Sequence, residues 1–347
     1  MPDDLAARQL HVVHVITTIG RGGAENQLLR VLRHLAGGPY RFTVIGLTRL
    51  GDAVLEPEFT ALGADVEILE MRPGRPTPAA LFRLHRILAA RRPDVVQTWL
   101  YHADLIGSLA ARRLRLPVIW TLQCGPTEDH QLGPTARFSR KLLRRKSGQW
   151  PSAIISSSQG TQQYHEQLGY AASLMTFIPN GADTTEFAPD PVRRQAMRQA
   201  LGVAPETVLI GISARCNEQK DYRTFVRAAA LVLQQRPHVR FVAYGENVTP
   251  DYPPLANWIE EAGLDLDAIQ LLGLRSDVAD LDRALDIGCL SSAYSETFPL
   301  AISEMMASGV PCSVTDVGDL ACMVGETGTV APPKDAEALA AALLELV

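Results

Sequence analysis

Cations and carboxylates gather in two short segments of the second half of the chain. In the segment 211–222, Arg215 and Lys220 lie five residues apart, after an apolar run and before a pattern of helical period. Two cations from one loop can converge on a diphosphate, because both side chains donate charge-assisted hydrogen bonds to phosphate oxygens. The alternative is that they are two solvated charges near the start of a helix.

The segment 295–311 carries two carboxylates and a proline. We predict that Glu296 lies in a loop, that Pro299 is the first residue of a helix, and that Glu304 lies in the second turn of that helix. The backbone amides of 297–300 would then face a ligand, with the positive end of the helix dipole behind them. Two carboxylates suit the recognition of sugar and ribose hydroxyls. The alternative is a capped amphipathic helix with two exposed glutamates.

A third segment, 17–25, is rich in glycine and lies between a predicted strand and a predicted helix. Gly22 and Gly23 permit close approach of the backbone to a ligand, and the amides of a helix N-terminus suit an anion. A plain connector is the alternative. Gly20 and Gly22 fit the G-x-G-x-x-G pattern, but Glu25 stands at the third glycine position. Its carboxylate would face a pyrophosphate, so we do not expect a nicotinamide dinucleotide site.

These segments follow strands of an α/β pattern. Short runs rich in Val and Ile alternate with longer runs of helical period, which indicates parallel strands crossed by helices. The runs are 10–16, 42–47, 66–69, 94–98, 117–122 and 153–156 in the first half, and 208–213, 239–244, 268–272, 286–290, 311–314 and 328–331 in the second.

Between the two series lies the segment 178–189, whose Pro, Asn and Gly residues favour turns. We place the hinge there and predict two doubly wound domains, residues 1–182 and 183–347. Open parallel sheets bind ligands outside the carboxyl ends of their strands, so the loops named above are expected at a shared cleft.

Composition sets further limits. The 347 residues include 46% hydrophobic residues, which is enough for two domains, and the net charge of -5 gives no general reason to bind nucleic acid. The five cysteines form no C-x-x-C pair, and no apolar stretch approaches the roughly 20 residues of a membrane span. We therefore expect a cytoplasmic protein. Two D-x-D strings, Asp265-Leu-Asp267 and Asp280-Leu-Asp282, fall in or beside helical runs and are interpreted as surface charge, so no metal site is expected.

One segment departs from the acidic balance. No acidic residue occurs from His130 to His165, and this stretch contains a helical run with Phe138 and Leu142 one turn apart. A basic amphipathic helix of this kind is typical of contact with an anionic membrane surface. The alternatives are a solvated helix face and a clamp for an anionic acceptor. The predicted patch consists of Arg137, Arg140, Lys141, Arg144, Arg145 and Lys146.

The motifs together resemble a known family. Arg215 with Lys220, followed by the E-x7-E pair of Glu296 and Glu304, is similar to the pattern of the retaining glycosyltransferases of family 4, which have the GT-B fold. The resemblance runs from about residue 10 to the end. It implies two Rossmann-like domains facing across a cleft, the first binding an acceptor and the second a nucleotide-diphosphate sugar. Further matching segments are Gly22-Gly-Ala-Glu25, Ile178-Pro-Asn-Gly181 and Thr315-Asp-Val-Gly318.

The resemblance also implies roles for individual residues. Arg215 and Lys220 would neutralise the diphosphate, and Glu304 would accept hydrogen bonds from the ribose. The sugar would be held by Glu296 with the segment Thr297, Phe298, Pro299 and Leu300. Gly22 and Gly23 would approach the donor phosphate, while Leu274 and Arg275 would read the base. The donor is most often linked to uridine, and such enzymes retain the anomeric configuration without a metal ion or cofactor.

The first domain departs from the family pattern at Gln123, where many relatives have a histidine or an arginine. A glutamine cannot usefully exchange a proton. His102, at the end of the fourth strand, is the candidate that replaces it, and the alternative is that His102 caps or packs its helix. The predicted catalytic set is therefore Glu296, Arg215, Lys220 and His102. A second departure is the end of the chain, Leu344–Val347, where relatives continue with a crossover helix that we expect to be lacking.

The predicted function is the transfer of a sugar from a nucleotide-diphosphate donor, which the family resemblance implies to be a UDP-sugar, to a glycan or lipid-linked acceptor in cell-surface polysaccharide synthesis. The protein would act in the cytoplasm, peripherally on the inner face of the membrane. Because fold alone does not give activity, two alternatives stay open. One is a sugar-nucleotide epimerase of the same architecture, and the other is a non-catalytic subunit that binds sugar nucleotides.

Overall fold

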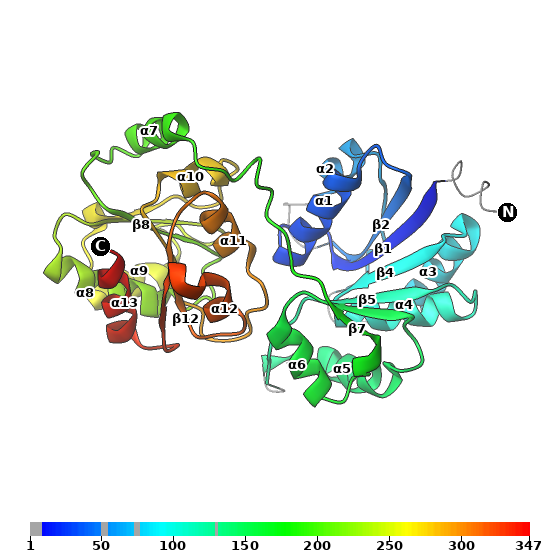
Figure 1. Cartoon of the computed structure of the whole chain (residues 1–347). Coiled ribbons are helices and arrows are strands. Elements are labelled where there is room, and N and C mark those ends of the chain that lie inside the picture. The colour runs from blue at the N-terminus through cyan, green and yellow to red at the C-terminus, as the bar shows by residue number, and fades with distance from the viewer. Residues whose placement is uncertain (1–8, 50–54, 73–76, 129–130) are drawn as a thin grey trace. The chain divides into compact units, whose positions relative to one another are not determined.

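The computed structural model describes residues 9–49, 55–72, 77–128 and 131–347 of the protein. The chain divides into two compact units, Met1–Asn180 and Gly181–Val347 (Figure 1). The division falls within the segment 178–189, two residues before the predicted boundary. Each unit has its own sheet and its own hydrophobic core.

Unit 1 is built on a seven-stranded parallel sheet with the order β3-β2-β1-β4-β5-β6-β7. All six runs predicted for the first half form strands. The seventh strand, β7, was missed because it has three residues, two of them exposed, and therefore shows no apolar run. The strands are β1 Leu10–Thr18, β2 Tyr40–Thr48, β3 Asp65–Ile68, β4 Val95–Trp99, β5 Val118–Leu122, β6 Ala153–Ser156 and β7 Met175–Phe177.

Helices cover both faces of this sheet. Buried side chains of α3, α4 and α5 pack on one face, and those of α1 and α2 pack on the other. The helices are α1 Gly23–Leu35, α2 Glu56–Ala61, α3 Pro78–Arg91, α4 Tyr101–Arg112, α5 Pro134–Lys146 and α6 Gln159–Gln167, with a 3-10 turn at Ala172–Leu174.

Unit 2 repeats the arrangement with a six-stranded parallel sheet of order β10-β9-β8-β11-β12-β13. All six predicted runs form its strands: β8 Leu209–Ser213, β9 Arg240–Tyr244, β10 Ile269–Leu271, β11 Ile287–Leu290, β12 Cys312–Thr315 and β13 Thr329–Ala331. Its helices are α7 Pro191–Ala200, α8 Tyr222–Gln235, α9 Pro253–Ala262, α10 Val278–Ala284, α11 Leu300–Ala307, α12 Leu320–Val324 and α13 Ala336–Leu346, with 3-10 turns at Leu266–Ala268 and Gly325–Thr327.

Strand order fixes where each unit can bind a ligand. In both sheets the chain first builds outward on one side and then crosses to the other, so the order reverses between β1 and β4 in unit 1 and between β8 and β11 in unit 2. Loops that leave neighbouring strands on opposite faces open a crevice at this point. In the described parts of the chain, no helix combines the length and the apolar character that a bilayer crossing requires.

Unit 1 also buries two neutral histidines. Burial lowers the pKa of His165 to about 4 and that of His14 to about 3. The His165 ring lies 2.8 Å from the Thr161 carbonyl oxygen and 2.8 Å from the Tyr101 hydroxyl. Because a carbonyl only accepts, Nδ1 of His165 carries the proton and Nε2 accepts from the tyrosine.

These rings make stability dependent on pH. Their folded pKa values lie below the ordinary value of 6.5, so the unfolded chain binds the proton first and stability is lost as pH falls from 6.5 towards 4. We expect His165→Gln to remove a slope of up to about 1.4 kcal/mol per pH unit from the free energy of unfolding in this window. Urea unfolding at a series of pH values measures this slope. An identical slope for the variant and the native chain would contradict a neutral buried His165.

Candidate functional site

The crevice of unit 2 is bordered by the loops that follow β8 and β11, which are adjacent in the sheet. Three of the hydrogen bonds between the loops involve the backbone. The backbone carbonyl of Gln219 accepts a hydrogen bond from the backbone amide of Ala293 at 2.8 Å. Its side-chain amide donates to the backbone carbonyl of Ser295 at 2.9 Å. Ser291 donates its hydroxyl to the carbonyl of Lys220 at 2.8 Å. Hydrogen bonds therefore hold the two loops together.

An ion pair lies between these loops. Nζ of Lys220 is 2.6 Å from Oε1 of Glu296, and the hydroxyl of Ser292 donates to the same oxygen at 2.5 Å. The Glu296 side chain is only 5% exposed. Charges removed from water in this way need partners, and here the carboxylate has a cation and a hydroxyl. An ammonium group has three donors, so Lys220 can hold Glu296 and still donate to a bound anion.

A third loop supports Glu296 from behind. Gly318, after β12, has φ +60, and a Cβ at this position would overlap the carbonyl oxygen of Glu296. Thr315 at the end of β12 donates its hydroxyl to the carbonyl of Ser292 at 2.7 Å. Only glycine meets both the left-handed backbone and the close approach.

The two glutamates are buried, at 4% exposure for Glu296 and 7% for Glu304. This contradicts the alternative of an amphipathic helix with two exposed glutamates. Glu304 lies in the second turn of α11, as predicted. The helix begins at Leu300 rather than at Pro299, whose ψ of 124 is extended, so the proline caps the helix instead of forming its first residue. Thr297 and Phe298 are half-buried.

The remaining donor candidates lie in less enclosed positions. Arg215 is exposed and shares the loop after β8 with Lys220. Leu274 is exposed, and Arg275 forms an ion pair with Asp277 at 2.5 Å. Both follow β10, which is separated from β8 by β9, and their role in reading the base stays a prediction.

In unit 1 the glycine-rich loop is organised by Glu25. Gly22 caps α1, which begins at Gly23, so the last three residues of the segment 17–25 belong to the helix. The carboxylate of Glu25 is buried, accepts a hydrogen bond from the hydroxyl of Thr18, and occupies the space that a Cβ on Gly22 would need. Glu25 therefore turns back over the loop.

His102 and Gln123 are both engaged within unit 1. Nε2 of His102 lies 3.3 Å from the hydroxyl of Thr135 at the start of α5, and burial lowers the pKa of His102. This contact agrees with the packing alternative for His102. The side-chain amide of Gln123 exchanges two hydrogen bonds with that of Asn180, at 2.8 and 3.1 Å. Gln123 thus ties the end of β5 to the last residue of the unit.

One residue of the predicted basic patch was assigned wrongly. Arg140 is buried, donates to the carbonyl of Thr127 at 2.8 Å and to the hydroxyl of Tyr164, and lies over the Tyr164 ring. With 3.6 residues per turn, Arg140 shares the inner face of α5 with buried Leu143. The other five members are exposed or half-buried: Arg137, Lys141, Arg144, Arg145 and Lys146.

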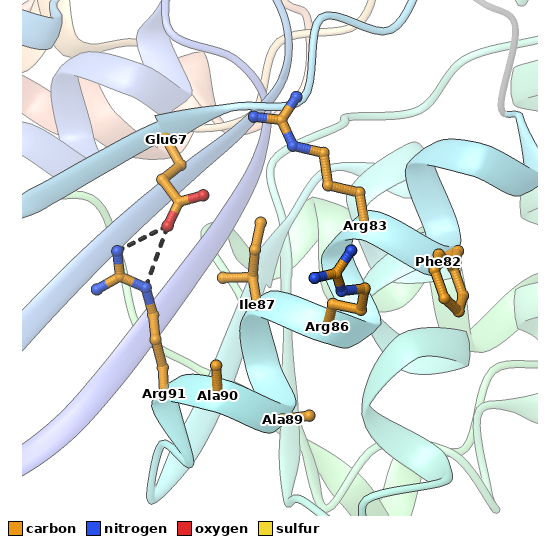
Figure 2. A pocket seen from close by; sticks show the side chains of 8 residues that line it. All are labelled: Glu67, Phe82, Arg83, Arg86, Ile87, Ala89, Ala90 and Arg91. Carbon is orange, nitrogen blue, oxygen red and sulfur yellow. Dashed lines mark hydrogen bonds and ion pairs between the residues drawn. The ribbon is translucent and has the colours of Figure 1, made fainter.

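A pocket also lies in unit 1, against α3 and β3, and is separate from the Lys220–Glu296 pair of unit 2. Figure 2 shows the ion pair of Arg91 with Glu67 at one side of it and Phe82, Arg83 and Arg86 from α3 at the other. We do not take it as a donor site because it lies far from the reversal of strand order.

Sequence reasoning missed the residues that hold the ion pair in place. Gln219, Ser291, Ser292 and Thr315 are small or uncharged polar residues at strand ends, and no pattern in the sequence shows which loops they join. Among the described residues, no group of three His, Cys, Asp or Glu side chains is arranged to hold a metal ion.

Comparisons with known proteins follow the same division of the chain. The family model described as Glycosyltransferase Family 4 matches residues 21–186, and that described as Glycosyl transferases group 1 matches residues 207–347. The solved structure of Anabaena HepE in complex with UDP-glucose has a TM-score of 0.83 at 23% identity, covering 97% of this chain and 89% of that one.

Curated relatives agree with these matches. The chain is 27% identical to the lipopolysaccharide core biosynthesis mannosyltransferase LpsB of Rhizobium meliloti, over 82% of this chain and 79% of the relative. It is 24% identical to the UDP-Gal:alpha-D-GlcNAc-diphosphoundecaprenol alpha-1,3-galactosyltransferase of Escherichia coli, over 71% of this chain and 63% of the relative. The fold is that of the GT-B glycosyltransferases. The chain is a glycosyltransferase that carries a family 4 domain in its first half and a group 1 domain in its second half.

The close approach of Gly318 to Glu296 can be tested with a matched glycine. Gly263 has φ +63, but a Cβ added there would have no neighbour within 4 Å. Gly263→Ala should therefore lower the free energy of unfolding only by the strain of a left-handed backbone, about 1–2 kcal/mol. We expect Gly318→Ala to cost at least about 1 kcal/mol more, because the new methyl group displaces the Glu296 backbone. Calorimetric unfolding compares the two variants. Equal losses would show that Glu296 does not depend on the β12 loop.

The inward position of Arg140 can be tested against a neighbour one turn away. Arg140→Met leaves the Thr127 carbonyl without its charged donor, and we expect a loss of about 1.5–3 kcal/mol in the free energy of unfolding. Arg144 is exposed, so Arg144→Met should stay within about 0.5 kcal/mol. Chemical denaturation measures both variants, and similar small effects would place Arg140 at the surface.

Proposed function

We propose that this glycosyltransferase transfers a sugar from a nucleotide-diphosphate donor, with UDP as the nucleotide, to a glycan or lipid-linked acceptor in cell-surface polysaccharide synthesis. The observation that carries the proposal is the Lys220–Glu296 pair at the reversal point of the second sheet. The choice of UDP is supported by the names of the similar proteins, one bound to UDP-glucose and one a galactosyltransferase that uses UDP-Gal.

In this proposal the fixed cations carry the charge that develops on the leaving group. Lys220 is held in place by Glu296, and Arg215 projects from the same loop, so both can meet the diphosphate as its bond to the sugar breaks. Fixed donors need no reorganisation during the reaction, and we propose that the transfer requires no metal ion. Glu304 would accept from the ribose, and Glu296 would contact the sugar.

The proposed stereochemical outcome is retention at the anomeric carbon. It rests on the family pattern of Glu296 and Glu304 and is checked by the anomeric coupling constant of the product in proton NMR. An inverted product would contradict this part of the proposal and leave donor binding untouched.

We further propose that the first unit binds the acceptor and that the protein works in the cytoplasm, peripherally on the inner face of the membrane. The E. coli relative is named for a diphosphoundecaprenol-linked acceptor, which supports a lipid-linked substrate. The exposed cations of α5 give such an acceptor, or the membrane that carries it, a complementary charge.

Product analysis with a panel of UDP-sugars tests the reaction. Transfer to an acceptor, or slow hydrolysis of the donor, is the expected result. Release of a different sugar still attached to the nucleotide would identify an epimerase. Binding without any turnover, with every donor and acceptor supplied, would identify a non-catalytic subunit.

Donor binding tests the residues. We expect Lys220→Met and Glu304→Ala each to weaken UDP affinity by about tenfold or more, because each loses a charge-assisted hydrogen bond. Arg227→Met removes an exposed cation of α8 in the same unit and should leave the affinity unchanged. Isothermal titration calorimetry with UDP supplies the measurement. Unchanged affinity in the first two variants would refute the site.

A further inference from the structure

Three helices of unit 1 lie side by side on one face of its sheet. His85 of α3 contacts the carbonyl oxygen of Ala110 on α4 at 3.0 Å, and His102 of α4 contacts Thr135 of α5 at 3.3 Å. Their inner sides share one hydrophobic cluster with the sheet, which includes Leu84, Leu105 and Leu143. Their outer sides consequently form one continuous surface, which we call the cationic face.

The cationic face carries basic residues and no exposed carboxylate from its own helices. The only acidic residue within α3, α4 and α5 is Asp104, which is fully buried. None of the exposed cations of this surface is ion-paired with a carboxylate in the described parts of the chain. They are Arg83 and Arg86 of α3, Arg112 and Arg113 at the end of α4, and Arg137, Lys141, Arg144 and Arg145 of α5.

Several cations elsewhere on unit 1 are matched with acids. At the edge of the sheet Arg91 pairs with Asp65 at 2.7 Å and with Glu67 at 2.6 Å, and Arg41 pairs with Asp65 at 3.0 Å (Figure 2 shows the Arg91–Glu67 pair). The cationic face gathers eight exposed cations on three adjacent helices in a chain whose net charge is -5.

Helix dipoles explain only part of this pattern. Cations in the last turn of a helix are stabilised by its negative end, which accounts for Arg112, Arg144 and Arg145. Arg83 and Arg86 lie in the first half and middle of α3, and Arg137 lies in the first turn of α5, where the dipole does not favour a cation. These positions need another reason.

Each helix also presents a large apolar side chain to solvent among these cations. Phe82 of α3 is 63% exposed, Phe138 of α5 is 62% exposed, and Leu109 of α4 is 37% exposed. Figure 2 shows Phe82 beside Arg83 and Arg86 on α3. Exposed aromatic groups surrounded by cations are the combination that binds anionic bilayers, because the rings enter the acyl boundary while the cations meet the headgroups.

We propose that the whole cationic face, and not α5 alone, lies on an anionic lipid bilayer. The proposal extends the membrane association proposed above and rests on it for the choice of partner. A soluble polyanion would satisfy the cations but would give the phenylalanines nothing to enter, so the exposed rings favour a membrane. Docking through three helices fixes the orientation of unit 1, which a single helix does not.

The experiment uses co-sedimentation of the full chain with phosphatidylcholine vesicles that contain phosphatidylglycerol, compared with phosphatidylcholine alone. We expect binding only to the anionic vesicles. Each cation near the membrane surface changes the partition coefficient onto anionic vesicles by about fivefold. Arg83→Ala with Arg86→Ala on α3 should therefore weaken partitioning roughly 25-fold. Phe82→Ser should also weaken it. The matched control, Arg227→Ala on α8 with Arg236→Ala at the C-cap of that helix, removes the same charge from unit 2 and should have little effect.

The outcomes separate the two proposals. If Arg144→Ala with Arg145→Ala weakens vesicle binding while the α3 variants do not, docking through the cationic face is wrong. Retention on dextran sulfate without binding to vesicles would also overturn it. UDP affinity of the α3 variants, measured separately, should stay at the native value. If the native chain does not bind UDP, the donor proposal alone is wrong and the vesicle result still holds.

Discussion

The ion pair between Lys220 and Glu296 organises the loops of the candidate donor site. A carboxylate that is 5% exposed is tolerated only if it is paired and hydrogen-bonded, and Lys220 and Ser292 provide both. Maintaining that pair requires the loops after β8, β11 and β12 to hold fixed positions. Gln219 and Ser291 join the first two, and Gly318 lets the third approach closely. The result is a cation kept in place before any ligand arrives.

The strand order of the two sheets explains why the site is where it is. Both units reverse their order beside the first strand, so the loops after β1 and β4, and those after β8 and β11, border crevices. Unit 2 fills its crevice edge with the ion pair and the N-terminus of α11. Unit 1 instead carries Glu25 folded over Gly22, and its positive charge lies on the outer side of α3, α4 and α5. The two units therefore present different chemistry on the same architecture.

The sequence predicted the strands well and the contacts poorly, for a physical reason. Twelve strands coincide with short apolar runs in the sequence, whereas β7, with exposed Thr176 and Phe177, shows no such run. The motifs placed Lys220 and Glu296 in two loops that are 76 residues apart in the sequence. Only the pairing of β8 with β11 brings the two side chains into contact. The local charge run on α5 showed how many cations there are and not which face each occupies, so Arg140 was placed outside. Its spacing from Leu143 was the signal that identifies the inner face.

A crystal structure of the protein with a nucleotide sugar bound would show whether Lys220 meets the diphosphate. We expect the diphosphate to lie within hydrogen-bond distance of Nζ of Lys220, the sugar to face Glu296, and the first turn of α11 to point its amides at the ligand. A nucleotide sugar bound on another surface, with the Lys220–Glu296 contact intact and distant from it, would contradict the account.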